Sequence, residues 1–431
     1  MVEHPWTHVP WPDPEPDRML GCLLGGAIGD ALGAPVEGMP LGEIRDRYGP
    51  DGVTAFVDGR FGRGAITDET QLTLFTADAL VGASERARER GIGGAVFGVL
   101  QQAYLSWLGG QDGTPVTGAA MPSSLGRVPE LVAPRGAGRA TLEALRETVR
   151  RKDREQMEGN RPGWSFGSPT EPVNDSKGCG GVVRAAPCGF PHLDPATAFK
   201  VGCGAAELTH GHLGGRLPAG VLAVLVSVLV RGGDLGTALD VARTELGRHP
   251  GHRETSGLLA EAVKLAGSGA GTVERLQRLG AGWTAGEALA IAVYAALAPV
   301  PGDPVHGDVQ ATGRHRLLLA VNHSGDSDST GSMCGNLVGA AGGTAALPRG
   351  LREAVEARDA IERVARDCAT EFGPNPPTDA QGYPLTRWSF PVPPGEASGW
   401  EPPPPPPYMT PPEPRGGPSS GAPSAPPPPG T

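Results

Sequence analysis

The chain has 431 residues, enough for one large domain or for about two to three ordinary domains. Its formal net charge of −10 makes it a poor candidate for non-specific binding to nucleic acids or anionic membranes, since both need a basic surface. The six cysteines include no Cys-x-x-Cys pair, which is typical of free thiols in a reducing compartment rather than of a zinc ribbon or a redox pair.

The N-terminal segment has neither a basic region nor an apolar core, so it does not look like a signal peptide. The longest apolar run, Leu217 to Val230, is shorter than the roughly 20 residues that cross a bilayer, and it predicts a buried helix. Together with the charge and the cysteines, these features predict a cytoplasmic protein without nucleic-acid or membrane partners.

Residues 17–372 carry the pattern of a globular, mainly helical domain. Small residues in the first predicted helix allow close helix packing. The second predicted helix begins with acidic residues, which are favoured in the first turn of a helix. Asp194 followed by Pro195, and Thr284 with Glu287, are helix-start patterns further along. Alternating strand patterns are rare, so the sequence predicts an all-α fold. In chain order, the predicted helices cover residues 17–33, 67–83, 194–210, 217–230, 284–297 and 351–372.

Two segments depart from this pattern. Residues 150–174 are polar and contain glycine and proline, which predicts a long surface loop. From Gly373 onwards the chain is dominated by proline, which predicts disorder or polyproline II instead of a core. We therefore predict an N-terminal extension (1–16), one large helical domain (17–372) and a Pro-rich low-complexity tail (373–431).

A polar stretch, NHSGDSDSTGS over residues 322–332, lies between two apolar segments. Asp326 and Asp328 are two positions apart and do not share a helix face, so both carboxylates reach one centre only from a loop or from the first residues of a helix. Gly325 permits the turn, and Ser329 or Thr330 is a candidate helix start. The simpler alternative is a serine-rich surface loop that ends in a helix cap.

A second acidic stretch, Thr67–Asp68–Glu69, opens an apolar helix. Its simplest interpretation is a helix cap followed by acids that favour the helix dipole. In the functional interpretation, the three residues supply oxygen ligands. Four carboxylates packed together repel one another, and a divalent cation would relieve this repulsion. Because the ligand set is oxygen-rich, with His323 as the only nearby nitrogen, it favours Mg²⁺ or Mn²⁺ over Zn²⁺. Two such ions, roughly 3.5–4 Å apart, could share the set.

Residues 174–187 form a glycine-rich stretch, NDSKGCGGVVRAAP. Its glycines leave backbone amides open, and such a loop entering a helix can hold a phosphate, to which Lys177 and Arg184 could add positive charge. A turn that merely caps a helix explains the same pattern equally well. The glycines are Gly178, Gly180 and Gly181.

Two further residues admit a simple and a functional interpretation. His210 follows a predicted helix, where a histidine is most often a partner of the helix dipole. Glu37 stands just beyond the first predicted helix, either as a further carboxylate of the acidic site or as an ordinary solvated acid. The adjoining GGAIGDALGAPVE lacks the G-x-G-x-x-G spacing and the preceding strand of a dinucleotide-binding motif.

Taken in order, these stretches resemble the ADP-ribosylglycohydrolase family, which includes the dinitrogenase-reductase-activating glycohydrolases. The resemblance spans residues 17–372 and implies an all-helical domain with a dinuclear Mg²⁺ or Mn²⁺ site in a central cleft. The family usually has aspartate where this chain has Glu69, so the carboxylate here reaches further by one methylene. The matching stretches are GCLLGGAIGDALGAPVEG, TDETQLTLFTADAL, NDSKGCGGVVRAAPCGF, AELTHGH and AVNHSGDSDSTGSMCGNLVGAAGG.

The resemblance also implies roles for single residues. The metals would lie between the two acidic stretches, and the glycine-rich stretch would contact the diphosphate of the substrate, with His210 on the nucleotide side. The implied metal ligands are Thr67, Asp68, Glu69, Asp326, Asp328 and Ser329. The implied catalytic residues are Glu37, Asp68 and Asp326, and the other implied substrate-binding residues are Asn174, Ser176, Gly178, Gly180 and Gly181.

These expectations predict a metal-dependent hydrolase that cleaves the glycosidic bond between ADP-ribose and a modified side chain, with arginine as the favoured linkage. Its partner would be an ADP-ribosylated protein or a small molecule that contains ADP-ribose. Two alternatives use the same cleft: a binding module for ADP-ribose or a partner without turnover, and a metal phosphohydrolase that breaks a different bond. Free ADP-ribose, tight binding without product, and AMP or phosphate would distinguish the three.

Overall fold

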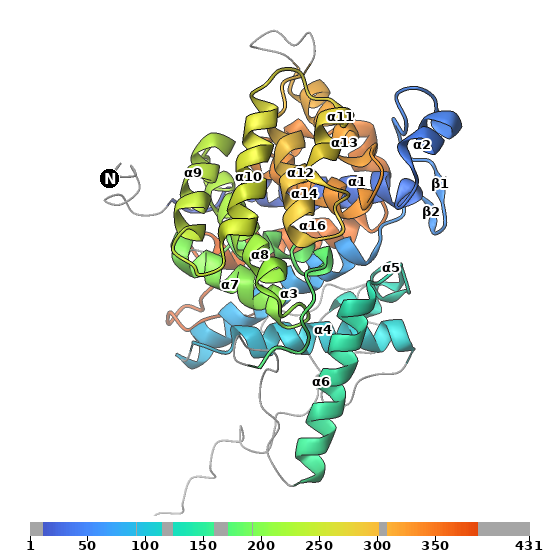
Figure 1. The fold of residues 1–431 in the computed structure, drawn as a ribbon. Coiled ribbons are helices and arrows are strands. Elements are labelled where there is room, and N and C mark those ends of the chain that lie inside the picture. Colours follow the sequence, from blue (N-terminus) through green and yellow to red (C-terminus); the bar gives the residue numbers. More distant parts are fainter. Residues whose placement is uncertain are drawn as a thin grey trace, which may run out of the picture. The chain divides into compact units, whose positions relative to one another are not determined.

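The computed structural model describes residues 12–91, 93–113, 124–158, 171–191, 193–300 and 308–386. They belong to one compact unit that ends at Thr386, and residues 387–431 lie outside the described residues. Within the described part the regular secondary structure is almost entirely helical, and the two strands have two residues each (Figure 1). The predicted all-α fold is confirmed.

The strands β1 (Asp58–Gly59) and β2 (Gly62–Arg63) pair as an antiparallel ribbon. The α-helices of the described residues are α1 (Pro16–Gly33), α2 (Leu41–Tyr48), α3 (Asp68–Arg90), α4 (Val96–Asp112), α5 (Pro129–Val132), α6 (Arg139–Met157), α7 (Pro195–Glu207), α8 (Leu213–Leu229), α9 (Leu235–Leu246), α10 (Arg253–Ala266), α11 (Val273–Leu276), α12 (Ala285–Leu297), α13 (Val309–Val321), α14 (Ser327–Gly342), α15 (Arg349–Ala354) and α16 (Arg358–Phe372). Short 3-10 helices are η1 (Ala34–Val36), η2 (Ser124–Arg127), η3 (Cys179–Gly181), η4 (Val183–Gly189), η5 (Gln277–Leu279) and η6 (Thr344–Ala346).

Helices α1 and α14 pack along each other with their backbones in contact (Figure 1). A Cβ atom on Gly25 would lie 2.1 Å from the carbonyl oxygen of Gly335, and one on Gly29 would lie 1.9 Å from that of Gly331. Only glycine allows two backbones to approach so closely. The glycines that predicted close helix packing therefore set the register of this pair, and the register brings Asp30 of α1 towards the start of α14.

Helix α1 and η1 together form an apolar stretch, Pro16–Val36, which is long and apolar enough to cross a membrane by length and composition. In the structure, 83% of its most apolar window is buried inside the protein, chiefly against α14 and α16. It is therefore accounted for as a core helix of a folded domain. The prediction that the protein has no membrane partner stays a prediction.

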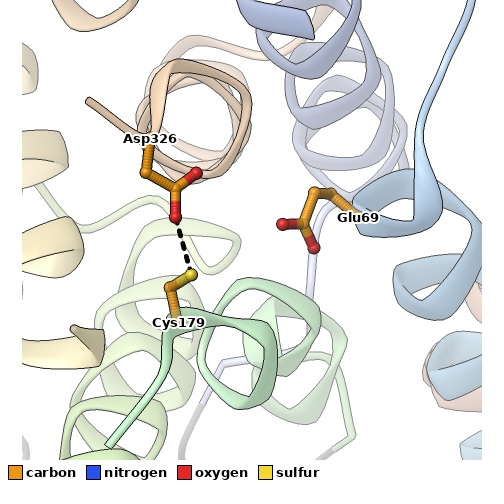
Figure 2. A group of neighbouring side chains, drawn as sticks. All are labelled: Glu69, Cys179 and Asp326. Carbon is orange, nitrogen blue, oxygen red and sulfur yellow. Dashed lines mark hydrogen bonds between the residues drawn. The ribbon is translucent and has the colours of Figure 1, made fainter. Parts of the chain in front are cut away.

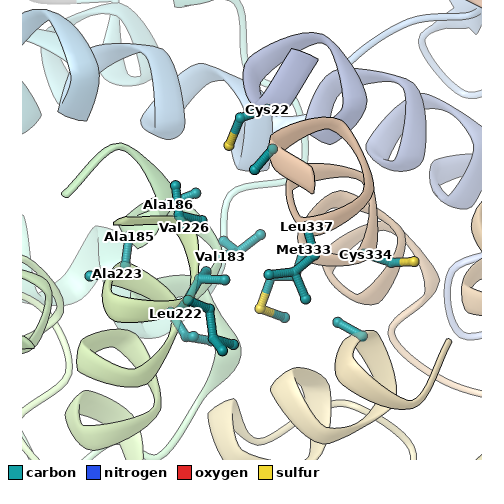
Figure 3. Close-up of a cluster of buried hydrophobic side chains, with 14 of the residues drawn as sticks. Cys22, Val183, Ala185, Ala186, Leu222, Ala223, Val226, Met333, Cys334 and Leu337 are labelled. Atoms are coloured by element: carbon teal, nitrogen blue, oxygen red, sulfur yellow. The ribbon is translucent and has the colours of Figure 1, made fainter. Parts of the chain in front are cut away.

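The hydrophobic core joins α8, η4 and α14 (Figure 3). The predicted buried helix over residues 217–230 is confirmed, since α8 is covered along its length by the helices around it. Figure 3 shows η4 contributing side chains on one side of the cluster and α14 on the other. The labelled core residues are Cys22, Val183, Ala185, Ala186, Leu222, Ala223, Val226, Met333, Cys334 and Leu337.

The predicted helix starts are confirmed where a capping side chain supports them. Asp194 caps α7 by accepting hydrogen bonds from the backbone N–H groups of Ala196 and Thr197, at 3.0 and 3.1 Å. Thr284 caps α12 by accepting from the N–H of Glu287 at 3.4 Å. Such bonds satisfy donors that the helix itself leaves free. The third predicted helix ends earlier than expected, at the end of α7, and does not reach residue 210.

The prediction of one continuous helix over residues 351–372 is wrong. The chain breaks between α15 and α16, where Ala357 adopts a left-handed conformation with φ of 57°. The carboxylate of Glu356 accepts from the N–H of Ile66 at 3.0 Å and pairs with Arg135 at 2.9 Å. These long-range contacts favour the break over the helical periodicity, and they support the chain just before the first acidic stretch.

The predicted loop over residues 150–174 is also partly wrong. Helix α6 continues to Met157, and Arg150 and Arg151 both pair with Glu147 at helical spacing, which supports this extension. Residues 159–170 lie outside the described residues.

The chain beyond α16 remains part of the first compact unit up to Thr386. Arg88 of α3 donates to the carbonyl oxygens of Pro377 and Leu385 and pairs with Glu371. The predicted start of the tail at Gly373 therefore falls inside this unit. The proposed domain limits stay a prediction for residues 1–11 and 387–431, which are not described.

Candidate metal centre

The first acidic stretch lies at the start of α3 and is held there by Asp30 of α1. The carboxylate of Asp30 accepts hydrogen bonds from the N–H and hydroxyl groups of both Thr67 and Thr70, over distances of 2.5–3.2 Å. Thr67 also caps α3 by accepting from the N–H of Glu69 at 3.3 Å. A buried carboxylate at a helix start is favoured by these charge-assisted bonds and by the helix dipole. Asp30 thus fixes where Asp68 and Glu69 begin the helix.

The second acidic stretch lies at the start of α14. Asp326 caps the helix, with its carboxylate 3.3 Å from the N–H of Ser329, and Asp328 accepts from the same N–H at 2.9 Å. Of the two sources expected, a loop or the first residues of a helix, the structure has the second, and the helix begins at Ser327, earlier than the expected start at Ser329 or Thr330. The backbone N–H of Asp326 donates to the carbonyl of Ala281 at 2.8 Å, so the loop after η5 packs directly on the site.

The two helix starts face each other. The hydroxyl of Ser329 donates to one carboxylate oxygen of Glu69 at 2.6 Å. Ligand atoms of Glu37, Asp326 and Asp328 all lie within 4.8 Å of one another. The backbone N–H of Gly38 donates to the carbonyl of Gly325 at 2.8 Å, which ties the exposed Glu37 to the start of α14.

The structure brings together Glu37, Glu69, Asp326, Asp328 and Ser329 from the predicted set. Thr67 and Asp68 are adjacent in sequence but belong to neither group of converging ligand atoms found among the described residues. The hydroxyl of Thr67 donates to Asp30, and Asp68 accepts a backbone hydrogen bond from Gly138. Their assignment as metal ligands stays a prediction.

Crowding and burial make the charged forms of these carboxyl groups costly. Burial, together with the charge of Asp30, raises the pKa of Asp68 to about 7, and burial raises the pKa of Asp30 itself to about 6. Burial and neighbouring carboxylates raise the pKa of Glu69 and of Asp328 well above the usual range. Burial and the charge of Asp326 raise the pKa of Glu37. The cluster needs protons or a cation to offset its charge.

The donor atoms of the cluster fit a divalent cation. One carboxylate oxygen of Glu69, Oε2, is buried and has no hydrogen-bond partner among the described residues, although buried polar atoms are normally paired. His323, the nitrogen that the sequence placed nearby, is fully buried and its Nε2 pairs with the hydroxyl of Thr330 at 2.9 Å. The remaining ligands are oxygens, as Mg²⁺ and Mn²⁺ prefer, and one sulfur.

Sequence reasoning missed two residues of this site. Asp30 is the one charged residue among the otherwise small and apolar residues 19–33, and this isolated charge was a signal of a buried partner. Cys179 lies in the glycine-rich stretch, and its thiol donates to Asp326 at 2.7 Å. The sequence carried no signal for this contact, because the two residues are far apart in the chain.

The glycines of the glycine-rich stretch make room for His210. A Cβ atom on Gly178 or Gly181 would lie 3.3 or 3.1 Å from a nitrogen of the His210 ring, and one on Gly180 would lie 3.5 Å from its Cε1. The ring is 2% exposed, and Thr209 hydrogen-bonds its Nδ1 at 2.8 Å. Burial lowers the pKa of His210 to about 3, so the ring is neutral and supports the stretch from behind.

Asn174 and Ser176 shape the same stretch. The side chain of Asn174 donates to the carbonyl of Thr209 and accepts from the N–H groups of Ser176 and Gly211, over distances of 2.8–3.2 Å. The hydroxyl of Ser176 accepts from the N–H of Gly178 at 3.1 Å. These side chains hold the loop in one conformation, and their contact with a substrate stays a prediction.

The two cations of this stretch are both engaged elsewhere. Lys177 pairs with Glu254 at 3.0 Å. Arg184 is completely buried, and its guanidinium stacks over the ring of Tyr104 at 4.3 Å. The idea that Arg184 adds charge to an open phosphate site is therefore wrong, because the side chain points into the core.

A further element borders the site. Thr284 forms an antiparallel bridge with Gly178, and Gly282 is so close to Asp326 that a Cβ atom would lie 3.3 Å from the aspartate Cβ. Between them in the chain, Trp283 is 48% exposed. An exposed indole on the loop between the carboxylates and the glycine-rich stretch is an available stacking surface.

Comparisons with known proteins were consistent with this geometry. The model of the ADP-ribosylglycohydrolase family matches residues 11–377. A solved structure titled "ADP-ribosylglycohydrolase-related protein complex" aligns with a TM-score of 0.54 at 25% identity, and the alignment covers 82% of this chain and 97% of that chain.

Among curated proteins, one from Archaeoglobus fulgidus without an assigned function is 24% identical over 361 residues, or 81% of this chain and 95% of its own length. The ADP-ribosyl-[dinitrogen reductase] glycohydrolase of Rhodospirillum rubrum is 47% identical over 62 residues, or 14% of this chain. An Escherichia coli protein is 36% identical over 73 residues, or 15% of this chain. The chain spans only 20% and 21% of the length of these last two relatives.

Proposed function

Because this chain belongs to the ADP-ribosylglycohydrolase family, we propose that it releases ADP-ribose from a modified side chain in a metal-dependent reaction, with arginine as its preferred linkage. The membership, which the sequence motifs predicted, makes the protein a hydrolase that acts on ADP-ribose linkages, carried by proteins or by small molecules. The observation that carries the finer proposal is the convergence of acidic side chains from the starts of α3 and α14.

In this proposal Glu69, Asp326, Asp328 and Ser329 hold Mg²⁺ or Mn²⁺, with two ions as the expected number. Their buried oxygens, including the unpaired Oε2 of Glu69 among the described atoms, match the ligands that these cations prefer. When bound, such ions orient ribose hydroxyls and polarise a water molecule. The pairing of Asp30 with Thr67 and Thr70 keeps the start of α3 rigid, so the ligands are already aligned.

Glu37 is the proposed general base. It is exposed, whereas Asp326 and Asp328 beside it are buried, so it alone of this group faces incoming solvent. Burial of part of the side chain and the charge of Asp326 raise its pKa, which makes the carboxylate a stronger base. It would accept the proton of the water that attacks the anomeric carbon as the glycosidic bond breaks.

The preference for arginine rests on charge. The cluster is acidic, and the exposed Glu37 places a carboxylate at its outer edge. A guanidinium group beside the scissile bond is attracted to such an edge, whereas an uncharged serine or acetyl group is not. The exposed Trp283 adds a surface on which a guanidinium can stack.

Product analysis tests the proposal. The full chain is incubated with ADP-ribosyl-arginine, ADP-ribosyl-serine or O-acetyl-ADP-ribose, with Mg²⁺, with Mn²⁺ or with a chelator. Free ADP-ribose from the arginine conjugate, lost with the chelator, supports it. Tight binding of ADP-ribose without product would favour a binding module, and AMP or phosphate would favour a phosphohydrolase. A cytoplasmic location is part of the proposal, and cell fractionation tests it.

A further inference from the structure

We propose that Glu69, Cys179 and Asp326 form a binding site for a thiophilic divalent cation of the Zn²⁺ class. The three side chains come from separate parts of the chain: the start of α3, the start of η3 and the residue that caps α14. The inference goes beyond the proposed function, because cation binding requires no turnover and adds a ligand that the acidic motifs do not contain.

The geometry around the thiol is that of a ligand group. Cys179 Sγ lies 2.7 Å from Oδ2 of Asp326 and 3.6 Å from the hydroxyl of Ser329. Ligand atoms of Glu69, Cys179 and Asp326 all lie within 4.8 Å of one another. A tetrahedral Zn²⁺ site needs ligand atoms about 3.3–3.8 Å apart, given its usual bond lengths, so small side-chain adjustments bring the group to that spacing.

A second observation points to a bound cation. Oε1 of Glu69 accepts from Ser329, but Oε2 is buried without a hydrogen-bond partner among the described residues. An unpaired buried carboxylate oxygen is costly, and coordination would remove that cost. Figure 2 shows the two carboxylates and the thiol pointing toward one another across the space between the helices. Glu69, which carries the unpaired oxygen, therefore belongs to the same group as the sulfur.

The sulfur of Cys179 determines which cations this group of three ligands prefers. Mg²⁺ selects oxygen ligands, whereas a thiolate beside carboxylates favours Zn²⁺ or Cd²⁺. The backbone just before Cys179 is fixed, because Gly178 bridges to Thr284 and the carbonyl of Lys177 accepts from the N–H of Ala285 at 2.9 Å. The thiol is thus held against the carboxylates before any ion arrives.

Binding is a simple exchange. The S–H bond of Cys179 breaks, its proton leaves to solvent, and a sulfur–metal bond forms without electron transfer. Glu69 and Asp326 are ligands in both this site and the proposed Mg²⁺ or Mn²⁺ site. A thiophilic cation and Mg²⁺ should consequently compete for these two carboxylates.

A spectroscopic titration tests the inference without any substrate. Cd²⁺ is added to the metal-free full chain, and the sulfur-to-metal charge-transfer absorption is recorded. We expect wild type and the control Cys203→Ser to show the band, since Cys203 is the other half-buried cysteine and lies outside the group. Cys179→Ser should lose the band and bind Cd²⁺ at least about tenfold more weakly. An unchanged band in Cys179→Ser, or none in wild type, overturns the proposal.

A second measurement uses only the wild-type protein, so it tests whether Cys179 binds the cation even if Cys179→Ser fails to fold. The protein is treated with iodoacetamide with and without Zn²⁺, and the modified cysteines are identified by mass spectrometry. Zn²⁺ should lower the labelling of Cys179 and leave the labelling of Cys203 unchanged, and excess Mg²⁺ should restore the labelling of Cys179. Equal labelling of Cys179 in both samples contradicts the inference. A chain that binds Cd²⁺ through sulfur but releases no ADP-ribose would refute only the proposed function.

Discussion

Asp234 and Asp326 cap two helices, α9 and α14, in the same way, but in very different surroundings. Asp234 is exposed, and hydrogen bonds from the N–H and hydroxyl of Thr237 hold the pKa of its carboxyl below the usual range. Asp326 is 2% exposed, and burial raises its pKa. The same local motif is electrostatically favourable at α9 and costly at α14, because a charged cap that is buried among other carboxylates needs a proton or a cation to offset its charge.

The largest expected difference between the two caps is in metal binding. Asparagine also caps helices, so Asp234→Asn and Asp326→Asn should both fold with little change in stability. We expect Asp326→Asn to lose more than about 100-fold in Mn²⁺ affinity and in ADP-ribose release, since a ligand charge is removed. Calorimetric Mn²⁺ titration and product analysis measure these losses, with Asp234→Asn as the matched control. Equal Mn²⁺ affinity in the two variants would contradict the claim that the cap of α14, unlike that of α9, is a metal ligand.

Two substitutions of Glu69, at the start of α3, separate the effect of its charge from the effect of its size. Glu69→Gln keeps the size but removes the charge, so we expect Mn²⁺ affinity and turnover to fall by about tenfold or more. Glu69→Asp keeps the charge and restores the residue usual in the family, so it should retain substantial activity. If Glu69 were only a favourable acid in the first turn, Glu69→Gln would cost about 0.3–1 kcal/mol of stability and leave turnover intact.

The buried carboxyls should also give the metal-free protein an unusual pH dependence. The folded-state pKa values of Asp30 and Asp68, about 6 and about 7, lie above the unfolded value of 3.8. Groups of this kind stabilise the fold fully below the unfolded pKa and lose that contribution as pH rises through the folded pKa. The loss is about 3 kcal/mol for Asp30 alone. Asp234, with its lowered pKa, acts in the opposite direction at more acidic pH.

Thermal melting with a chelator measures this effect. The metal-free protein should melt at a lower temperature at about pH 8 than at about pH 5. Saturating Mg²⁺ should raise the melting temperature most at the higher pH, since the cation takes the place of the lost protons. A metal-free protein that is more stable at the higher pH would show that other groups outweigh the buried carboxyls.

The smallest effect is expected at the exposed cap. Asp234→Ala removes the hydrogen bond to the N–H of Thr237 and should cost about 1 kcal/mol of stability. Mn²⁺ affinity and ADP-ribose release should match wild type, because α9 supplies no ligand to the groups found among the described residues. Chemical denaturation measures the cost, and a loss of Mn²⁺ binding would show that the two helix starts are not independent.

The parts of the fold that sequence reasoning predicted are those that depend on near neighbours. Asp194 and Thr284 were recognised as caps because each bonds an N–H two or three residues further on. The helix break at Ala357 was missed, because Glu356 bonds to Ile66, 290 residues away in the chain. A helical pattern of apolar residues cannot predict a contact with so distant a partner.

The candidate site divides in the same way. Its acidic stretches and their place at helix starts followed from residue types and spacing, and the family resemblance predicted that they face each other. The pairing of Asp30 with Thr67 and of Cys179 with Asp326 was not predicted, since the first joins α1 to the start of α3 and the second joins η3 to the cap of α14 across 147 residues of the chain.

By itself, the sequence determined the starts of helices that carry a local side-chain cap, such as α7 and α12, because a capping bond is formed within a few residues and needs no other part of the fold. The tertiary structure decided which of the acids at helix starts are charged, crowded and able to bind a cation. The reason is electrostatic: the cost of a carboxylate depends on the water removed from it and on the charges packed around it, and both come from distant segments of the chain.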